Sequence, residues 1–140
     1  MTYIKTDDLL GSLRNTTTLD DYLTSQKQHF LDTELPGLLE RLCDQKQMSK
    51  AQVFHGAELN EIYGYQIFAG KRRPSRDKLL CIGLSLGLNE DEMQSLLKSA
   101  EMAPLYPKLK RDSIILFGFM KNQSVMEVNQ SLFANNLETL

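Results

Sequence analysis

The sequence predicts an all-α protein of short helices built around one five-helix domain. Apolar residues recur at intervals of three and four along most of the chain, which is the spacing of one helix face. Short apolar runs are separated by capping residues and glycines, so the helices are brief. We expect three parts: an N-terminal helical extension (1–34), the five-helix domain (35–99) and a C-terminal helical cap packed on it (100–140).

The composition is that of an ordinary globular protein. The chain has 140 residues, of which 41% are hydrophobic and 24% charged, enough for one modest core. No apolar run approaches the roughly 20 residues of a membrane span, and the first residues do not resemble a secretion signal. We therefore expect a cytoplasmic protein without a membrane partner. Cys43 and Cys81 lie in apolar helical patterns without a CxxC motif, which favours buried reduced thiols.

Charge is distributed unevenly along the chain. The formal net charge is −2, yet residues 46–78 carry seven basic and three acidic side chains, a net charge of +4. The remainder of the chain then carries −6. A basic segment in an acidic chain fits a local phosphate-binding face and also an ordinary solvated surface.

The C-terminal third contains a weak internal repeat at an offset of 35 residues. Each copy starts with a capping residue followed three positions later by Glu, the capping-box arrangement, and continues with apolar residues. The matched residues are Asn89, Glu92, Met93, Leu97, Met102 and Leu105 with Ser124, Glu127, Val128, Leu132, Leu137 and Leu140. Between the copies we expect a helix over 105–122, apolar nearly all round and the most buried element of this part.

Residues 49–78 have the organisation of a helix-turn-helix. A short helix capped by Ser49 is followed by a break, a second helix over 60–69, Gly70 and a basic loop. This segment, SKAQVFHGAELNEIYGYQIFAGKRRPSRDK, resembles the phage-repressor (Cro-like, XRE) family of helix-turn-helix regulators. The resemblance implies that residues 35–99 form a lambda-repressor-like five-helix helix-turn-helix domain. The residues that carry the resemblance are Val53, Ala57, Leu59, Ile67, Gly70, Pro74 and Ser75.

The chain departs from the family pattern at four positions. Phe54 stands where the family has a small residue, and Gly64 stands where it has a branched apolar one. Because these positions face each other, we expect the Phe54 ring to lie against the backbone of Gly64, with the two volumes exchanged. Glu58 replaces the usual turn glycine, which leaves the turn geometry open, and Phe68 replaces a common Glu.

The resemblance implies which residues meet DNA. Base edges would be read by side chains of the second helix and by one residue of the first: Asn60, Glu61, Tyr65, Gln66 and Gln52. Asn and Gln can each make two hydrogen bonds to adenine. Glu61 would need Lys50 to neutralise it. For Asn60 and Gln66, a plain helix cap and a solvated side chain fit the sequence equally well.

A second group of residues would contact the sugar-phosphate backbone. These are Lys50, Lys71, Arg72, Arg73, Ser75 and Arg76, at the first helix and around the start of the helix that follows Pro74. They would set affinity rather than sequence preference.

The expected function is sequence-specific binding of double-stranded DNA as a transcriptional regulator, with repressor the commoner role in this family. A homodimer through the N- or C-terminal helices would place two recognition helices in successive major grooves. The alternative is a protein–protein interaction module or antitoxin-like adaptor on the same scaffold. The sequence holds no enzyme motif and no metal-ligand spacing. We therefore expect no catalysis, cofactor, metal or small-molecule ligand.

Overall fold

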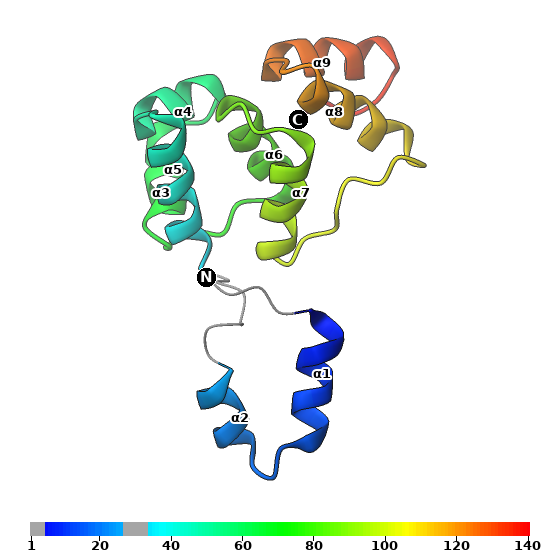
Figure 1. Ribbon diagram of the computed structural model, residues 1–140. Coiled ribbons are helices and arrows are strands. Elements are labelled where there is room, and N and C mark those ends of the chain that lie inside the picture. Colours follow the sequence, from blue (N-terminus) through cyan, green and yellow to red (C-terminus); the bar gives the residue numbers. More distant parts are fainter. Residues whose placement is uncertain (1–4, 27–33) are drawn as a thin grey trace. The chain divides into compact units, whose positions relative to one another are not determined.

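The computed structural model describes residues 5–26 and 34–140, and the regular secondary structure in those ranges consists of helices joined by loops (Figure 1). No strand occurs in them, which confirms the all-α prediction. The chain divides into two compact units, Met1–Asp32 and Thr33–Leu140. The parts of the predicted N-terminal extension at 1–4 and 27–33 lie outside the described residues.

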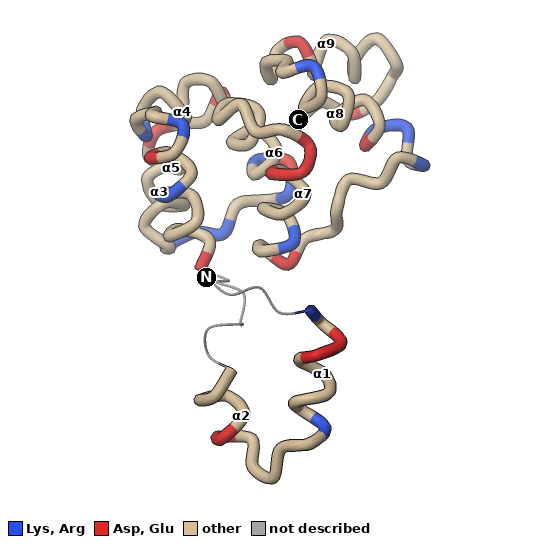
Figure 2. Tube along the Cα trace, viewed as in Figure 1, with Lys and Arg blue, Asp and Glu red and all other residues tan. Residues whose placement is uncertain are grey.

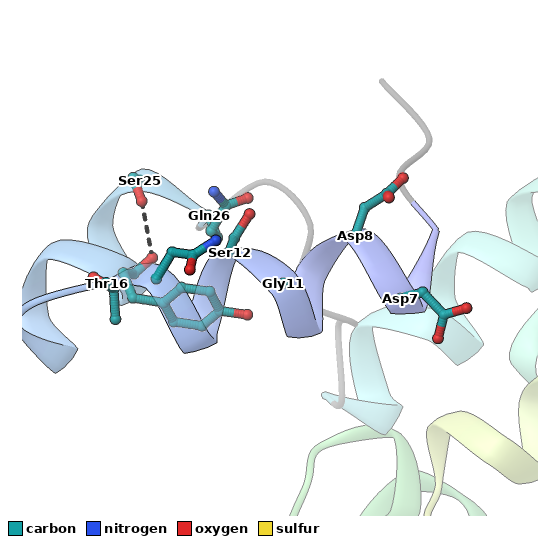
Figure 3. A pocket seen from close by; sticks show the side chains of 9 residues that line it. Asp7, Asp8, Gly11, Ser12, Thr16, Ser25 and Gln26 are labelled. Atoms are coloured by element: carbon teal, nitrogen blue, oxygen red, sulfur yellow. Dashed lines mark hydrogen bonds between the residues drawn. The ribbon is translucent and has the colours of Figure 1, made fainter.

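The described residues of the first unit, 5–26, form two helices, α1 (Thr6–Asn15) and α2 (Leu19–Ser25). The hydroxyl of Thr18 accepts a hydrogen bond of 3.2 Å from the amide of Asp21 and so caps α2. Figure 3 shows the hollow between the two helices, where the Ser25 hydroxyl donates to the carbonyl of Tyr22. Mostly polar residues line this hollow: Asp7, Asp8, Gly11, Ser12, Asn15, Thr16, Tyr22, Ser25 and Gln26.

The second unit contains seven described helices. These are α3 (Leu35–Lys46), α4 (Lys50–Gly56), α5 (Glu61–Phe68), α6 (Arg76–Ser85), α7 (Glu90–Ser99), α8 (Lys110–Met120) and α9 (Val125–Ala134). The first five lie within the range predicted for a five-helix domain. Helix α5 packs against α3 and α4, while α6 packs against α4, α7 and α9.

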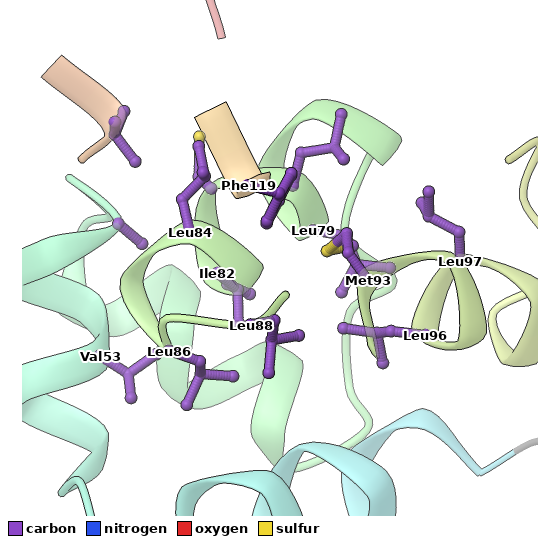
Figure 4. Packing of buried hydrophobic residues seen from close by; sticks show 14 of the residues in the cluster. Val53, Leu79, Ile82, Leu84, Leu86, Leu88, Met93, Leu96, Leu97 and Phe119 are labelled. Atoms are coloured by element: carbon purple, nitrogen blue, oxygen red, sulfur yellow. The ribbon is translucent and has the colours of Figure 1, made fainter. Parts of the chain in front are cut away.

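Helix α6 is the centre of the core. Its six residues from Leu79 to Leu84 are all buried, so it is covered on every side, and it carries no charged residue after Lys78. Figure 4 shows Leu79, Ile82 and Leu84 of this helix among side chains from α4, α7 and α8. Burying one such side chain stabilises a fold by about 1.5–3 kcal/mol, so α6 contributes the largest share of the core.

Helices α4 and α5 approach each other closely at Phe54 and Gly64. The Phe54 side chain is fully buried, and a Cβ atom at Gly64 would lie 2.6 Å from Cδ1 and Cε1 of its ring. The Phe54 ring therefore lies against the backbone of Gly64, as expected from the sequence. The ring also meets Phe68 and Tyr65 edge to face, with centroid distances of 5.3 and 5.0 Å.

The turn between α4 and α5 forms without a glycine. Glu58 adopts a left-handed backbone conformation with φ of 56°, the conformation that glycine adopts most easily. The amide of Leu59 donates a hydrogen bond of 2.9 Å to the carbonyl of Phe54, which closes the turn. Glu58 therefore takes the backbone conformation for which the family uses Gly.

Helix α8 begins later than the sequence predicts. The prediction began this helix at Leu105, but residues 102–106 are not helical and α8 starts at Lys110. Pro107 restricts the backbone of the residue before it, and the amide of Tyr106 donates to the carboxylate of Asp112 instead of to a helical carbonyl. As predicted, α8 is the most buried helix of the C-terminal part: five of its residues are buried, against three in α9, although Phe117 and Met120 are half exposed.

The 35-residue repeat extends over two complete helical hairpins. Helices α7 and α9, offset by 35 residues, both begin with capping boxes. A backbone amide at the end of each copy makes the same hydrogen bond. The amide of Leu105 donates to the side chain of Gln94 (2.8 Å), and the amide of Leu140 donates to the side chain of Asn129 (2.7 Å). Hairpin α6–α7 with its tail (76–105) and hairpin α8–α9 with its tail (111–140) are therefore two copies of one structural unit.

The two copies hold each other through reciprocal ion pairs. Each begins with an Arg-Asp dipeptide, and each arginine binds the aspartate of the other copy. Arg76 pairs with Asp112 at 3.1 Å, and Arg111 pairs with Asp77 at 3.0 Å. Each guanidinium also donates to carbonyl groups in the tail of its own copy: Ala103 and Pro104 for Arg76, Glu138 and Thr139 for Arg111.

We expect Gly64→Val to destabilise the second unit by about 1–3 kcal/mol, because any side chain at this position overlaps the buried Phe54 ring. Gly37→Ala in α3 is the matched control, since its nearest neighbour would be 3.9 Å away and alanine favours the helix. Urea unfolding followed by circular dichroism measures both. Equal free energies of unfolding for wild type and Gly64→Val would contradict the tight contact.

Candidate nucleic-acid interface

Helix α5 presents a continuous exposed face. Gly64, Ile67 and Phe68 turn inward and are buried, whereas Glu61 and Tyr65 are exposed. Gln66 is half-buried on the same outward side. The structure therefore brings together three of the predicted base-reading residues, since Tyr65 and its neighbour Gln66 follow Glu61 by about one helical turn.

Asn60 is the N-cap of α5. Its Oδ1 accepts hydrogen bonds from the amides of Ile62 (2.9 Å) and Tyr63 (3.3 Å). The side-chain oxygen of Asn60 is therefore occupied by the helix cap, and only the side-chain NH₂ group can donate hydrogen bonds to DNA. The two hydrogen bonds to adenine expected for Asn60 do not fit this arrangement, although one donated hydrogen bond does.

Gln52 has a similar double role at the start of α4. Its Oε1 accepts from the amide of Ser49 at 2.8 Å, while the hydroxyl of Ser49 accepts from the amide of Gln52 at 3.2 Å. The two residues form a capping box. Gln52 is exposed, and it too retains its NH₂ group as an outward donor.

Lys50 is paired with Glu40 of α3 and not with Glu61. The distance between Nζ and Oε1 is 2.6 Å, and the hydrogen bond with Glu40 raises the pKa of Lys50. The same ammonium lies 5.7 Å from the centroid of the Phe68 ring. Lys50 therefore does not neutralise Glu61, so the condition stated for Glu61 to approach phosphates is not met.

Two exposed cations lie at the carboxyl end of α5. The amides of Lys71 and Arg72 both donate to the carbonyl of Gln66, at 2.9 and 3.3 Å, which fixes the loop to the helix end. The Arg72 guanidinium lies 5.3 Å from the centroid of the Tyr63 ring. Figure 2 marks the Lys and Arg positions of the chain in blue. The side chains of Lys71 and Arg72 are both exposed to solvent.

The other predicted phosphate contacts have partners inside the protein. Arg76 is held by Asp112 and two backbone carbonyls, so its guanidinium stabilises the C-terminal hairpins. Arg73 donates to the carbonyl of Ala100, and the hydroxyl of Ser75 accepts from the amide of Lys78 as the cap of α6. Of the six predicted phosphate contacts, Lys71 and Arg72 are the two best placed to meet a phosphate.

Ile62 is a surface residue that the sequence analysis did not select. Its side chain is 71% exposed, one turn before Gln66 on the outward face of α5. An apolar residue beside Asn60, Glu61 and Tyr65 offers a surface for a thymine methyl group. The sequence pattern could have predicted this exposure. Ile67 and Phe68 form the buried face of this short helix, so Ile62 lies on the exposed side.

The described part of the chain shows no sign of a metal or membrane site. Within residues 5–26 and 34–140, no group of three or more His, Cys, Asp or Glu side chains is arranged to hold a metal ion. No described helix is long and apolar enough to cross a membrane. Cys43 and Cys81 are buried and unpaired, as predicted, and burial raises the pKa of Cys81 to about 11.

No protein-family model matches this chain, and the searches of curated proteins and of solved structures found no match. The site is therefore interpreted from its own residues.

We expect Asn60→Ser to keep the stability of the wild type, because a serine hydroxyl caps a helix about as well as an Asn side chain. Asn60→Ala removes the cap and should lower the free energy of unfolding by about 1 kcal/mol. Thermal unfolding of the three proteins measures this. If Asn60→Ala unfolds at the same temperature as the other two, the capping role of Asn60 is refuted.

Proposed function

We propose that this protein binds specific sequences of double-stranded DNA as a transcriptional regulator, as a repressor rather than an activator. Helices α4 and α5 would form a helix-turn-helix of the phage-repressor type, with α5 in the major groove. The observation that carries the proposal is the exposed polar face of α5, which ends in the cations Lys71 and Arg72.

Helix α5 would read base edges with the groups that remain free. The NH₂ groups of Asn60 and Gln52 would each donate one hydrogen bond, while the amide of Gln66 would address adenine. Ile62 would meet a thymine methyl group, and Tyr65 would add its hydroxyl at the edge of the groove. This assigns specificity mainly to the amino-terminal two turns of the helix.

Lys71 and Arg72 would neutralise phosphates beside the groove. Arg76 is occupied and Lys50 is paired, so the electrostatic part of the binding depends on few cations. Each neutralised phosphate contributes a slope of about −0.9 in a plot of log affinity against log salt concentration. We therefore propose a shallow slope of about −2 per chain, and a need for paired chains to reach high affinity.

The test measures binding to mixed genomic duplex fragments across a salt series. Wild type is compared with Lys71→Ala/Arg72→Ala, which should bind more weakly and lose most of the salt slope. The matched control is Lys108→Ala/Lys121→Ala, which removes the same charge from two exposed positions outside α5 and its loop. It should keep both affinity and slope.

Asn60→Ser separates sequence reading from folding in the same assay. It retains the cap, so the loss of the single hydrogen bond donated by the Asn60 amide should reduce discrimination between preferred and random fragments by about 0.5–1.5 kcal/mol without unfolding the protein. Absence of binding by folded wild type at low salt would contradict the proposed function. If Lys71→Ala/Arg72→Ala and the matched control lose equal affinity for DNA, binding depends on the total charge of the protein and not on these two side chains.

A further inference from the structure

The two copies of the repeated hairpin differ in one respect: a helix covers the outer face of α6 but not the equivalent face of α8. In the first copy, α4 packs on α6, where the hydroxyl of Ser85 donates a hydrogen bond of 2.7 Å to the carbonyl of Val53. Ile82, one turn earlier on the same face, is fully buried. This face of the repeat unit is thus a helix-binding surface in copy one.

In the second copy the equivalent residues are large, apolar and exposed. Ile82 corresponds to Phe117 and Ser85 to Met120 at the 35-residue offset, and their side chains are 51% and 54% exposed. Leu109, at 55%, continues the stripe to the amino-terminal end of α8. Phe117 and Met120 lie one turn apart on α8, and Leu109, its N-cap, lies about two turns before Phe117. Groups of exposed apolar side chains on one face mark binding sites, and we call this group the stripe Leu109–Phe117–Met120.

Positive charge lies at both ends of this stripe. Lys108 and Lys110 are exposed at its amino-terminal end, and Lys121 is exposed at its carboxyl-terminal end. The Lys121 ammonium lies 5.7 Å from the centroid of the Phe117 ring. Asp112, the acidic residue within α8, is buried beneath Arg76 and does not offset these charges at the surface.

We propose that the stripe Leu109–Phe117–Met120 binds an acidic amphipathic helix of a partner protein, placed as α4 is placed on α6. The repeat indicates a helix as occupant, since the same face holds one in the first copy. The lysines favour acidic residues flanking its apolar side. This inference goes beyond DNA binding and does not depend on it.

Two other occupants fit the surface less well. A second copy of the same face, related by a two-fold axis, would bring lysines against lysines. Nucleic acid would meet three adjoining apolar side chains, whereas protein surfaces that bind DNA are polar and strongly positive. The acidic helix satisfies both the apolar stripe and its charged ends.

The experiment uses the full-length protein and two synthetic probes. One probe is a fluorescein-labelled, hydrocarbon-stapled helical peptide with leucines on one face and glutamates on both flanks. The second is identical except that lysines replace the glutamates. We expect saturable binding of the glutamate peptide, measured by fluorescence anisotropy, with an affinity at least about tenfold higher than that of the lysine peptide.

Three variants assign the binding to the stripe. Phe117→Ser/Met120→Ser should lose about tenfold or more in affinity, because the apolar contact area is removed. Phe133→Ser is the matched control, since this residue of α9 is 78% exposed and lies outside the stripe. Lys110→Glu/Lys121→Glu should reverse the preference between the peptides. Circular dichroism confirms that each variant is folded.

Several results would overturn the proposal. Equal binding of both peptides, or binding that Phe117→Ser/Met120→Ser leaves unchanged, would exclude this surface as the site. Self-association in analytical ultracentrifugation that this variant abolishes would assign the face to a second copy. Loss of duplex DNA binding in the same variant would assign it to nucleic acid.

Discussion

The contact between the Phe54 ring and the backbone of Gly64 fixes the geometry on which the rest of the second unit depends. Because Gly64 has no side chain, α4 and α5 approach closely enough for the ring to fill the space between them. The same ring packs edge to face against the rings of Phe68 and Tyr65. The packing of Phe54 against Gly64 therefore determines which residues of α5 face outward.

The duplicated hairpin explains why the C-terminal part belongs to the core. Helix α6 contacts α4 on one side and α9 on the other, so the first copy serves both the helix-turn-helix and the second copy. The crossed Arg-Asp pairs fix the relative position of the copies, and each arginine also holds a tail. A buried ion pair that is fully hydrogen-bonded selects one arrangement rather than adding much net stability.

Local features were predictable from the sequence. The capping boxes at Asn89 and Ser124, the cap at Ser49 and the contact between Phe54 and Gly64 were all expected and are present. The caps depend on residues within one turn, so rules of helix geometry suffice to predict them. The contact between Phe54 and Gly64 was inferred from the resemblance, which places the two positions opposite each other on helices joined by a short turn.

The features that the sequence analysis missed depend on distant partners. Arg76 has the charge expected of a phosphate contact, but its partner Asp112 lies 36 residues away. Lys50 was expected to contact a phosphate, yet Glu40 on a neighbouring helix holds it. The wider repeat was visible in the matching Arg-Asp dipeptides at 76–77 and 111–112, which would have placed both arginines inside the fold.

The most direct test of the proposed interface is an NMR titration of the ¹⁵N-labelled protein with a duplex selected from the genomic fragments. We expect saturable changes in amide chemical shifts to cluster at residues 60–66 and at Lys71 and Arg72. The amides of α8 and α9 should remain unchanged. Changes confined to those two helices, or none at a duplex concentration that saturates binding, would contradict the assignment of α5 as a recognition helix.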